Sequence, residues 1–436
     1  MIDPYNNRAI NKLIPTSVNN LILRLHEISL FALGFLIPFN SLLMRYMLGI
    51  FIVSSLLLYH KRLKDILAKQ YTGFLLLLVF FLFYAISFFY SEAHRESLLD
   101  LQKKVPLVLL PLALFISGIS RQKQYHLFLS YLYGMLAVTG ACVIYFVYRF
   151  FTDSYFHSEV TGYPFDMIYS NFYFLGNVNY YAVYLNIATI LILGIMAHAR
   201  FKMFTKRSKR MMYTGLFLSI ALVLLLSSRA GVLAILIVLL FSVYYLSKSR
   251  YIQIFSLICL LLGVFYITQH PRFRNYIQIF EKMLYSSEYL EEDYLLQQSA
   301  LRMVFWEGAV RVIQDHTWFG VGNGDVKSSM QDVYRTMGVY DKLKTKNNPH
   351  NQFLRTFVAT GIPGLTSLLA FFVYGIVTGI RYRNYFLIAF LMLLAIHFFF
   401  KSMLFRIDGV VCFSFFYALL WLHGITATSN PASKDP

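Results

Sequence analysis

The chain has 436 residues, of which 58% are hydrophobic and 18% aromatic, and its mean hydropathy is +0.57. Soluble globular proteins do not carry this much apolar surface in long uninterrupted runs, so the composition excludes that class and predicts a protein that crosses a membrane many times. The formal net charge of +18 is concentrated in short loops between apolar runs, which is a topology signal, and no nucleic-acid partner is predicted.

Twelve apolar runs, taken in chain order, are predicted to cross the membrane as α-helices. They cover residues 21–39, 41–59, 71–90, 104–118, 125–150, 177–197, 211–226, 230–247, 251–268, 350–379, 384–400 and 409–424. We therefore expect an all-α polytopic membrane fold of about twelve transmembrane helices, with one large, partly helical outer loop before the tenth span. The first run has no small-x-small cleavage site, so no cleavable signal peptide is expected.

The loops between these runs alternate in charge. Every loop that shares a side with the N-terminus is basic, and the acidic residues in or beside these loops are Asp3, Glu27, Asp65 and Asp435. Loop 151–176, on the other side, contains no lysine or arginine. By the positive-inside rule, both termini are predicted to be cytoplasmic, and loops 151–176 and 269–349 to lie on the outer side.

Cysteine and histidine usage argues against metal or redox chemistry. The three cysteines, Cys142, Cys259 and Cys412, all lie within apolar runs, so neither a disulfide framework nor a thiolate metal site is predicted. The eleven histidines are scattered, without a His-x-x-x-His pair or a carboxylate cluster beside them. We therefore predict no bound metal and no cofactor.

The outer loop 269–349 is too long to be a simple connector. Within it, apolar residues recur at helical spacing and predict an amphipathic helix from about 298 to 316, which either lies on the membrane surface or packs over the bundle. These residues are Leu301, Val304, Phe305, Gly308, Ala309, Val312 and Ile313. We expect one integral membrane domain, residues 1–436, with the loop 269–349 as a lobe within it.

The polar stretch 347–352 closes this loop and opens the next apolar run. Asn348 is a good helix cap and Pro349 suits a first helical position, which would put His350 in the first turn of a membrane helix. Gly361 would then lie on nearly the same face about 16 Å deeper, leaving room for a long, thin ligand. A histidine at a helix end is usually a capping or interfacial residue, but a neutral imidazole there can also take a proton from an acceptor hydroxyl.

Two arginines are candidates for holding a phosphate. Arg302 stands one turn before Trp306 on the amphipathic helix, and the pair is either an interfacial anchor or part of a phosphate site. Arg229 lies in a very short turn between two predicted spans. Its charge either reaches the outer surface of the membrane by extension of the side chain or is held by a fixed partner, and we favour a fixed partner.

Two further features are weaker. Lys103 and Lys104 start the fourth predicted span, where lysines are usually simple anchors but can also meet an anionic headgroup. The glycine cluster, residues 320–325, superficially resembles a phosphate-binding loop. It has no preceding strand and no following Lys-Ser/Thr, so we interpret it as a turn that orients the lobe and predict no nucleotide site.

His350-Asn351, followed after nine residues by Gly361-x-x-Gly364, resembles the signature of the O-antigen ligase and polymerase superfamily, His-[Asn/Ser/Gln]-x9-Gly-x-x-[Gly/Thr/Tyr]. The resemblance covers roughly residues 165–420. Further matching features are Arg302 with Trp306 and the segment 318–324, Ser228-Arg229 followed by Ala-Gly, the segment 177–180, and the final stretch 402–416.

The resemblance implies a glycosyltransferase of the bacterial inner membrane with a periplasmic active site. Such proteins take a glycan from undecaprenyl diphosphate; a ligase passes it to lipid A-core and a polymerase to another lipid-linked repeat. By resemblance, His350 would assist deprotonation of the acceptor hydroxyl while Arg302 and Arg229 hold the diphosphate. Trp306, Asn351, Gly361 and Gly364 are then expected to contact substrate. Lys103 and Lys104 lie outside the resemblance and are added to the expected substrate contacts as candidate headgroup partners. Transfer would invert the anomeric carbon without a metal, and membrane lipids would surround the protein.

Three alternatives remain beside the ligase, which the twelve spans and the long outer loop favour. A polymerase shares the motif. A transporter would need ionisable residues near mid-span and two related halves; Arg45, Arg149, Arg229 and Arg355 lie nearer the outer third of their predicted spans, and no paired halves are evident. A non-catalytic scaffold in a glycan-export complex is the third, and normal product from a His350→Ala variant would favour it.

Overall fold

The structure is a computed structural model that describes residues 16–63, 72–152, 172–197, 205–226, 228–247, 249–269, 298–343 and 348–428. These residues form helices and contain no β-strand. The α-helices are α1 (Thr16–Leu36), α2 (Leu42–Tyr59), α4 (Thr72–Ser87), α5 (His94–Lys104), α6 (Pro106–Ser117), α7 (Arg121–Thr152), α10 (Val178–Ala197), α11 (Lys206–Leu225), α12 (Arg229–Leu246), α13 (Arg250–Gln269), α16 (Gln298–Asp315), α17 (Val326–Thr336), α18 (Tyr340–Leu343), α19 (Gln352–Arg381), α20 (Tyr385–Phe400) and α21 (Ile407–Thr428). Short 3₁₀ helices are η1 (Ile37–Phe39), η2 (His60–Arg62) and η5 (Met403–Phe405).

The described part of the chain is all-helical, as expected for a polytopic membrane protein. Seven of the described helices are long and apolar enough to cross a membrane: α1, α2, α7, α10, α11, α19 and α21. Helices α4, α12 and α20 are apolar but shorter. Helices occur at all twelve predicted positions, but a count of twelve membrane crossings stays a prediction.

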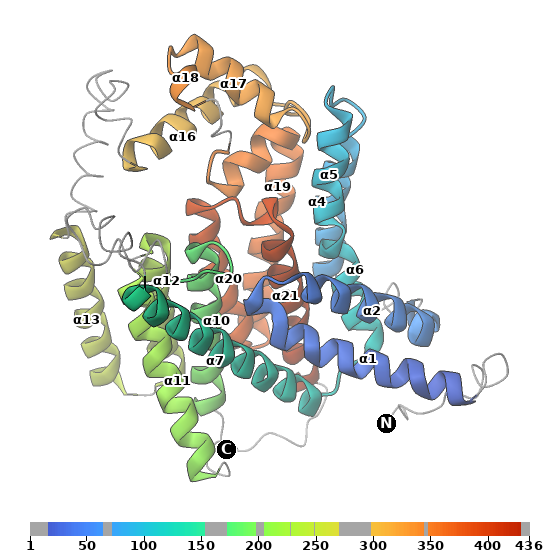
Figure 1. Cartoon of the computed structure of the whole chain (residues 1–436), viewed down its shortest axis with the longest axis vertical. Coiled ribbons are helices and arrows are strands. Elements are labelled where there is room, and N and C mark those ends of the chain that lie inside the picture. Colours follow the sequence, from blue (N-terminus) through green and yellow to red (C-terminus); the bar gives the residue numbers. More distant parts are fainter. Residues whose placement is uncertain are drawn as a thin grey trace.

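The fourth predicted span, 104–118, falls on α6 and on the last residue of α5. Helix α6 has 12 residues and rises about 18 Å, which is less than the roughly 30 Å of a hydrocarbon core. Val105 keeps helical angles (φ −48°, ψ −41°) between α5 and α6, so the two helices follow each other directly. In Figure 1, α5 rises above α6 toward the end of the molecule that carries α16.

The core of the bundle is built around two helices that are apolar on all sides. Helix α21 lies at the centre, with 94% of its most apolar window buried inside the protein, and α10 follows with 78%. A helix that is hydrophobic all round is expected to be surrounded by other helices, and these two have no polar stripe. Helix α21 packs on α6, α19 packs on α4 and α20, and α12 packs on α20.

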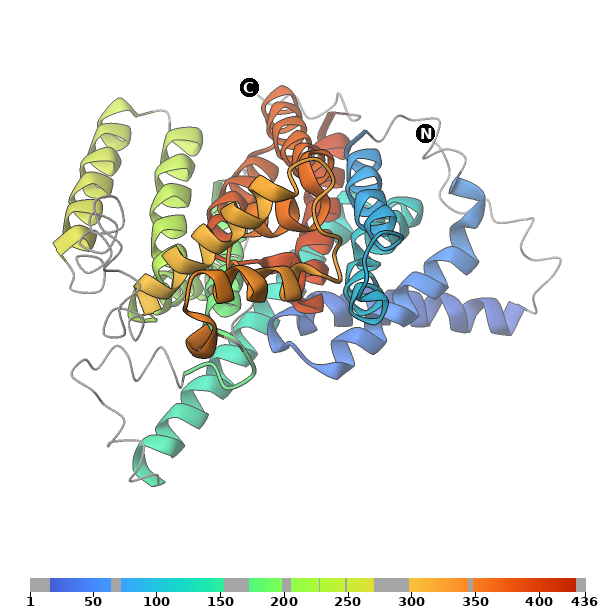
Figure 2. The same cartoon turned by 90° about the horizontal axis from the view of Figure 1, so that it is seen from above.

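Helices α16, α17 and α18 form a small lobe, residues 298–343, at one end of the bundle (Figure 1). Seen from above in Figure 2, α16 and α17 lie across the ends of the red and orange C-terminal helices. The amphipathic helix predicted for 298–316 is present as α16, and all seven of its predicted apolar-face residues are buried. It packs against α19 and α17, so of the two predicted positions the structure shows the one over the bundle.

Candidate functional site

His350 lies just before α19 rather than in its first turn. The N-cap is Asn351, whose side chain accepts a hydrogen bond from the Leu354 N–H at 3.0 Å, and α19 begins at Gln352. The expectation that Asn348 caps this helix is therefore wrong, since Asn351 fills that position. Asn348 instead accepts a hydrogen bond from the His350 N–H at 3.0 Å, and His350 adopts a left-handed backbone with φ of 52°.

The segment that carries His350 is bonded to the connection between α20 and α21, residues 401–406. The Ser402 hydroxyl donates to Asn348 Oδ1 at 2.6 Å. Two residues further along this connection, the Leu404 N–H donates to Gln352 Oε1 at 2.8 Å. Because these bonds lie on either side of His350, they limit how far the histidine backbone can move.

The lobe covers His350 from the other side. The ring of Phe305, on α16, lies 5.6 Å from the imidazole ring, measured between centroids. Trp306, the next residue, packs edge-on against Phe399 in the last turn of α20, with the ring centroids 5.2 Å apart. Arg302 is half-buried and lies one turn earlier on the same helix. The imidazole therefore lies where α16, the start of α19 and the end of α20 meet.

Lys401 joins these residues, although the sequence analysis gave it no role. Burial and the positive charges of Arg302 and Arg406 lower the pKa of the Lys401 ammonium from 10.5 to about 8. The charge of each arginine therefore acts on the Lys401 ammonium. Such a group of cations attracts an anion, because a bound phosphate would relieve the repulsion.

A buried charged cluster lies beneath this end of the bundle. Lys104 is bonded to Asp100, and the guanidinium of Arg355 lies 3.9 Å from the same carboxylate; all three side chains are buried. Arg355 also lies over the ring of Phe405, 4.0 Å from its centroid. Arg355 thus links the start of α19 to α5 and to the 401–406 connection, which is a positioning contact that the sequence analysis did not predict.

The two lysines expected at an outer headgroup site have different surroundings. Lys104 is 1% exposed and points into the protein, so the structure does not place it at the surface where a headgroup contact was expected. Lys103 is half-buried, and its ammonium lies 5.1 Å from the ring centroid of Phe405. Helical geometry explains the difference, since successive residues point about 100° apart and only one can face the core.

Gly361 breaks α19, so the predicted continuous face from His350 to Gly361 does not exist. The glycine has φ 64° and ψ −159°, a conformation closed to other residues. The break, with a proline two residues on, releases two helix carbonyls. The oxygens of Val358 and Ala359 accept hydrogen bonds from the N–H groups of Val321 and Gly322, at 2.8 and 3.1 Å.

The space beside both motif glycines is filled by protein. A Cβ at Gly361 would stand 2.2 Å from the carbonyl oxygen of Trp318 and 2.6 Å from the nitrogen of Phe319. At Gly364 the side chain of Thr360 occupies the corresponding volume. The expected room for a long ligand against these glycines is therefore absent, because lobe backbone packs beside Gly361 and the Thr360 side chain packs beside Gly364. Their substrate contacts remain a prediction without a surface to support it.

The glycine cluster (residues 320–325) acts as the turn that the sequence analysis expected, orienting the lobe on the bundle. Beyond its bonds to α19, it binds the loop between α4 and α5. The carboxylate of Asp325 accepts hydrogen bonds from the N–H groups of Glu92 and Ala93, at 2.7 and 2.9 Å. The Gly324 N–H donates to the Ser91 hydroxyl at 3.0 Å.

Arg229 is the first residue of α12, and its side chain lies outside what the structure describes. The preceding residue, Ser228, caps α12 and donates a hydrogen bond to Asn179 at the start of α10, at 2.9 Å. Next to Asn179, the Tyr180 hydroxyl donates to the carbonyl of Met403 at 3.2 Å. The start of α12 is thus connected through α10 to the 401–406 connection, which also contacts the His350 segment.

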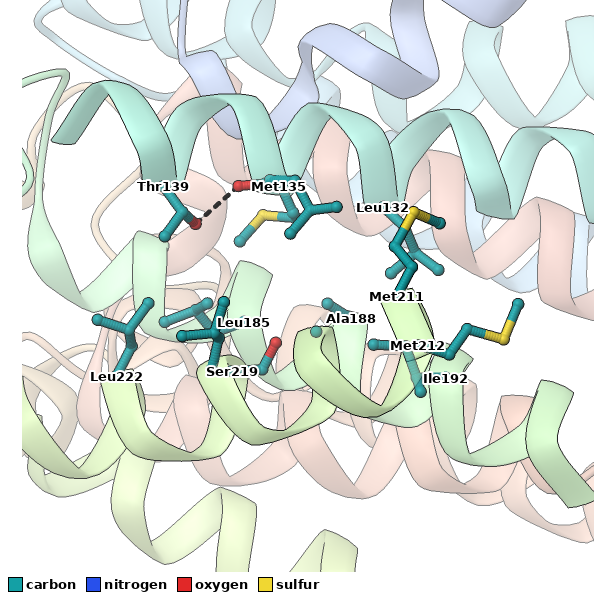
Figure 3. A pocket seen from close by; sticks show the side chains of 13 residues that line it. Leu132, Met135, Thr139, Leu185, Ala188, Ile192, Met211, Met212, Ser219 and Leu222 are labelled. Carbon is teal, nitrogen blue, oxygen red and sulfur yellow. Dashed lines mark hydrogen bonds between the residues drawn. The ribbon is translucent and has the colours of Figure 1, made fainter. Parts of the chain in front are cut away.

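The structure also contains an apolar crevice between α7, α10 and α11, drawn in Figure 3. Its lining is aliphatic side chains and methionines, with Thr139 and Ser219 as the hydroxyls. Thr139 is already bonded to the carbonyl of Met135 and to the hydroxyl of Tyr181, both at 2.7 Å. With a cavity of about 30 Å³ and no charged lining residue, the crevice suits hydrocarbon and not a sugar phosphate.

Fold and site together define a multi-pass helical membrane protein whose lobe covers a cluster of cations and one histidine. Residues 214–369 match the family model described as O-antigen ligase. This match supports the resemblance seen in the sequence: over these residues the chain is similar to the O-antigen ligase family. The matched region runs from α11 into α19 and includes Arg229, Arg302, Trp306, His350 and both motif glycines. The comparison with curated proteins gave no match.

Proposed function

We propose that this protein is an O-antigen ligase, which transfers a glycan from undecaprenyl diphosphate to a hydroxyl of lipid A-core. The observation that carries the proposal is the convergence of Arg302, Lys401 and His350 where α16 crosses the ends of α19 and α20. Cations suit a diphosphate, and an imidazole beside them suits an attacking hydroxyl. The family match supports the reaction class.

The proposed reaction is a single displacement. His350 takes the proton of the acceptor hydroxyl as the oxygen attacks the anomeric carbon, and the carbon–oxygen bond to the diphosphate breaks. The bonding electron pair leaves with the diphosphate, whose growing charge Arg302 and Arg229 stabilise. Lys401 is added here as a third cation. Attack opposite the leaving group inverts the anomeric carbon, and the cations carry the leaving-group charge without a metal.

The proposed location is the bacterial inner membrane, with both termini cytoplasmic and the site periplasmic. The basic loops on the N-terminal side support this orientation through the positive-inside rule. The lobe end, with α16 over the His350 segment, would then face the periplasm, where both lipid-linked substrates are available. Membrane lipids would contact the exposed apolar faces of α2, α7 and α13.

Transfer by purified protein tests the proposal. With a defined undecaprenyl diphosphate glycan and lipid A-core, His350→Ala should lower kcat by about 10²–10⁴-fold, the range for loss of a general base. Arg302→Ala should lower it by about 10²–10³-fold, since a charge-stabilising donor is lost. His316→Ala and Arg311→Ala, exposed positions of the same lobe, serve as controls and should retain activity.

Two outcomes would count against this account. Activity of both site variants at the wild-type level would reject the site. Loss of wild-type transfer on addition of EDTA would reject the proposal that side-chain cations alone stabilise the leaving diphosphate. A polymerase of the same superfamily is the second candidate, because the family match covers both branches.

A further inference from the structure

A second basic surface lies beside the proposed active site, in an open groove of about 430 Å³. The groove runs between the start of α2, the last turn of α5 and the start of α21. Its lining includes three cations, Arg45, Lys103 and Arg406, against a single carboxylate, Asp408. The net charge of the lining is therefore positive, which favours an anionic ligand.

Arg45 and Arg406 lie near the carboxylate of Asp408 but are not hydrogen-bonded to it. Arg45 Nη2 lies 3.7 Å from Asp408 Oδ1, and Arg406 Nε lies 3.6 Å from Asp408 Oδ2. Both separations exceed hydrogen-bond length, so the guanidinium donors keep their capacity for a ligand. Each arginine is also about half exposed, with 43% and 51% of the side chain accessible. A planar guanidinium can then bind a phosphate through two parallel N–H groups.

The burial of Asp408 provides a second indication of a ligand. Its side chain is 3% exposed and lines the groove, yet Oδ1 has no hydrogen-bond donor. A buried carboxylate oxygen without a donor is unfavourable, and a ligand hydroxyl would satisfy it. The groove can therefore bind a ligand that carries two groups close together: a phosphate, which binds the cations, and a hydroxyl, which donates to Asp408. A phosphorylated sugar carries both.

The rim of the groove suits a ligand attached to a lipid. Leu99, Phe405 and Ile407 line it beside the charged residues. Leu99 is 46% exposed, and Tyr46, next to Arg45 on α2, is 61% exposed. Apolar side chains around a charged floor fit an amphiphile whose headgroup enters while its chains stay in the bilayer.

The groove and the proposed active site share one piece of chain. The connection 401–406 carries Lys401 at its start, close to Arg302, and Arg406 at its end, in the groove. Between them, Phe405 has Arg355 over one side of its ring and Lys103 nearby. A ligand held in the groove would therefore bring its sugar to the edge of the site that contains His350.

We propose that this groove binds the phosphate of a phosphorylated glycolipid, with a neighbouring sugar hydroxyl on Asp408, and that this glycolipid is the acceptor of the transfer. The assignment to the acceptor rests on the proposed function. The shared chemistry, a phosphate beside a hydroxyl on a lipid, also occurs in phosphatidylglycerol, so the experiment includes that lipid as a separate arm.

The test is a binding titration on the purified full chain in detergent, without donor. The probes are bisphosphorylated lipid A, the same lipid A after removal of both phosphates, and phosphatidylglycerol. The wild-type protein should bind the bisphosphorylated form about tenfold more tightly than the dephosphorylated form. Arg45→Gln and, separately, Lys103→Gln should each remove most of that difference, since each deletes a charged partner of the phosphate. Arg95→Gln, an exposed arginine of α5 outside the groove, should bind as the wild type does.

Equal binding of bisphosphorylated lipid A by the wild type and both groove variants would overturn the proposal. Displacement of lipid A by an equal concentration of phosphatidylglycerol would overturn the acceptor assignment and give the groove to a membrane phospholipid. Because no donor is present, this result is independent of catalysis. A wild-type protein that binds the phosphorylated lipid but transfers no glycan in the separate assay would instead reject the proposed function.

Discussion

Lys401 shows how a few side chains set the electrostatics at the lobe end of the bundle. It follows directly on a strongly apolar helix, and the charges that act on it include those of Arg302 and Arg406. Burial and these two charges favour the neutral amine, so its pKa is lowered to about 8. The amine is therefore charged below about pH 8 and neutral above it, which makes Lys401 a pH-sensitive part of the proposed diphosphate site.

Donor binding should weaken as the pH rises through about 8, because Lys401 then loses the charge that attracts the diphosphate. The dissociation constant of the lipid diphosphate, measured between pH 7 and 9.5, should rise several-fold over this range. Lys401→Arg should remove the rise, since arginine stays charged, and Lys401→Gln should bind weakly throughout. Lys327→Gln, exposed on α17, is the control. A wild-type affinity that does not change with pH would contradict this role.

Individual site residues could be predicted from the sequence only where they belong to a local sequence pattern. His350, Arg302 and Trp306 were identified from spacing and resemblance. In the structure, the helix α16 that carries Arg302 and Trp306 packs over the segment that carries His350. Lys401 was missed because one lysine after an apolar run looks like an ordinary anchor. Its importance depends on α16, about 100 residues earlier in the chain, and local spacing contains no information about that contact.

The break in α19 is the main finding at the scale of elements. It turns a single long apolar run into two helical pieces, and the released carbonyls hold the backbone of residues 321 and 322. The motif glycine is thus explained by close backbone packing, since a Cβ at Gly361 would overlap the carbonyl of Trp318.

Gly361→Ala should destabilise the protein and loosen the lobe. The strained backbone angles alone cost about 1–3 kcal/mol for a non-glycine residue, and the overlap with Trp318 adds to this. Thermal unfolding in detergent should show a lower Tm, with transfer activity reduced as well. Gly140→Ala in α7, where nothing lies within 4 Å of the added Cβ, is the matched control and should keep Tm or raise it slightly, since alanine is the better helix former. An unaltered Tm in Gly361→Ala would argue against the packing described here.

Helix positions could be predicted far better than helix interruptions. Long apolar runs gave the locations of the membrane helices, and the 3.6-residue period gave α16 to within a residue or two. The break at Gly361 and the start of α19 at Gln352 were not predicted. Both depend on partners distant in sequence, the lobe backbone for the break and Ser402 with Leu404 for the start.

At the scale of the whole molecule, burial separates the central helices of the bundle from the helices around them. The buried helices α10 and α21 form the centre, and helices with exposed apolar faces surround them. Composition alone predicted this membrane architecture. The number of membrane crossings could not be settled in the same way, because helices such as α6 are short and are covered by protein.

The cellular product separates the two candidate functions. In a strain that lacks the gene, a missing ligase should leave unsubstituted lipid A-core while full-length polymer accumulates on its lipid carrier. Analysis of extracted lipopolysaccharide and of the lipid-linked pool measures both. Complementation with His350→Ala should fail to restore the product. Appearance of single-repeat glycans on lipid A-core in the deletion strain would identify a polymerase instead.

The lobe is fastened at two places, to the interrupted part of α19 and to the turn between α4 and α5. If the lobe lifted away from the bundle, several hydrogen bonds to main-chain groups would break at once. The buried groups would then have no water molecules to replace these bonds. We therefore expect lipid-linked substrates to reach and leave the proposed active site by lateral passage between helices, within the plane of the bilayer.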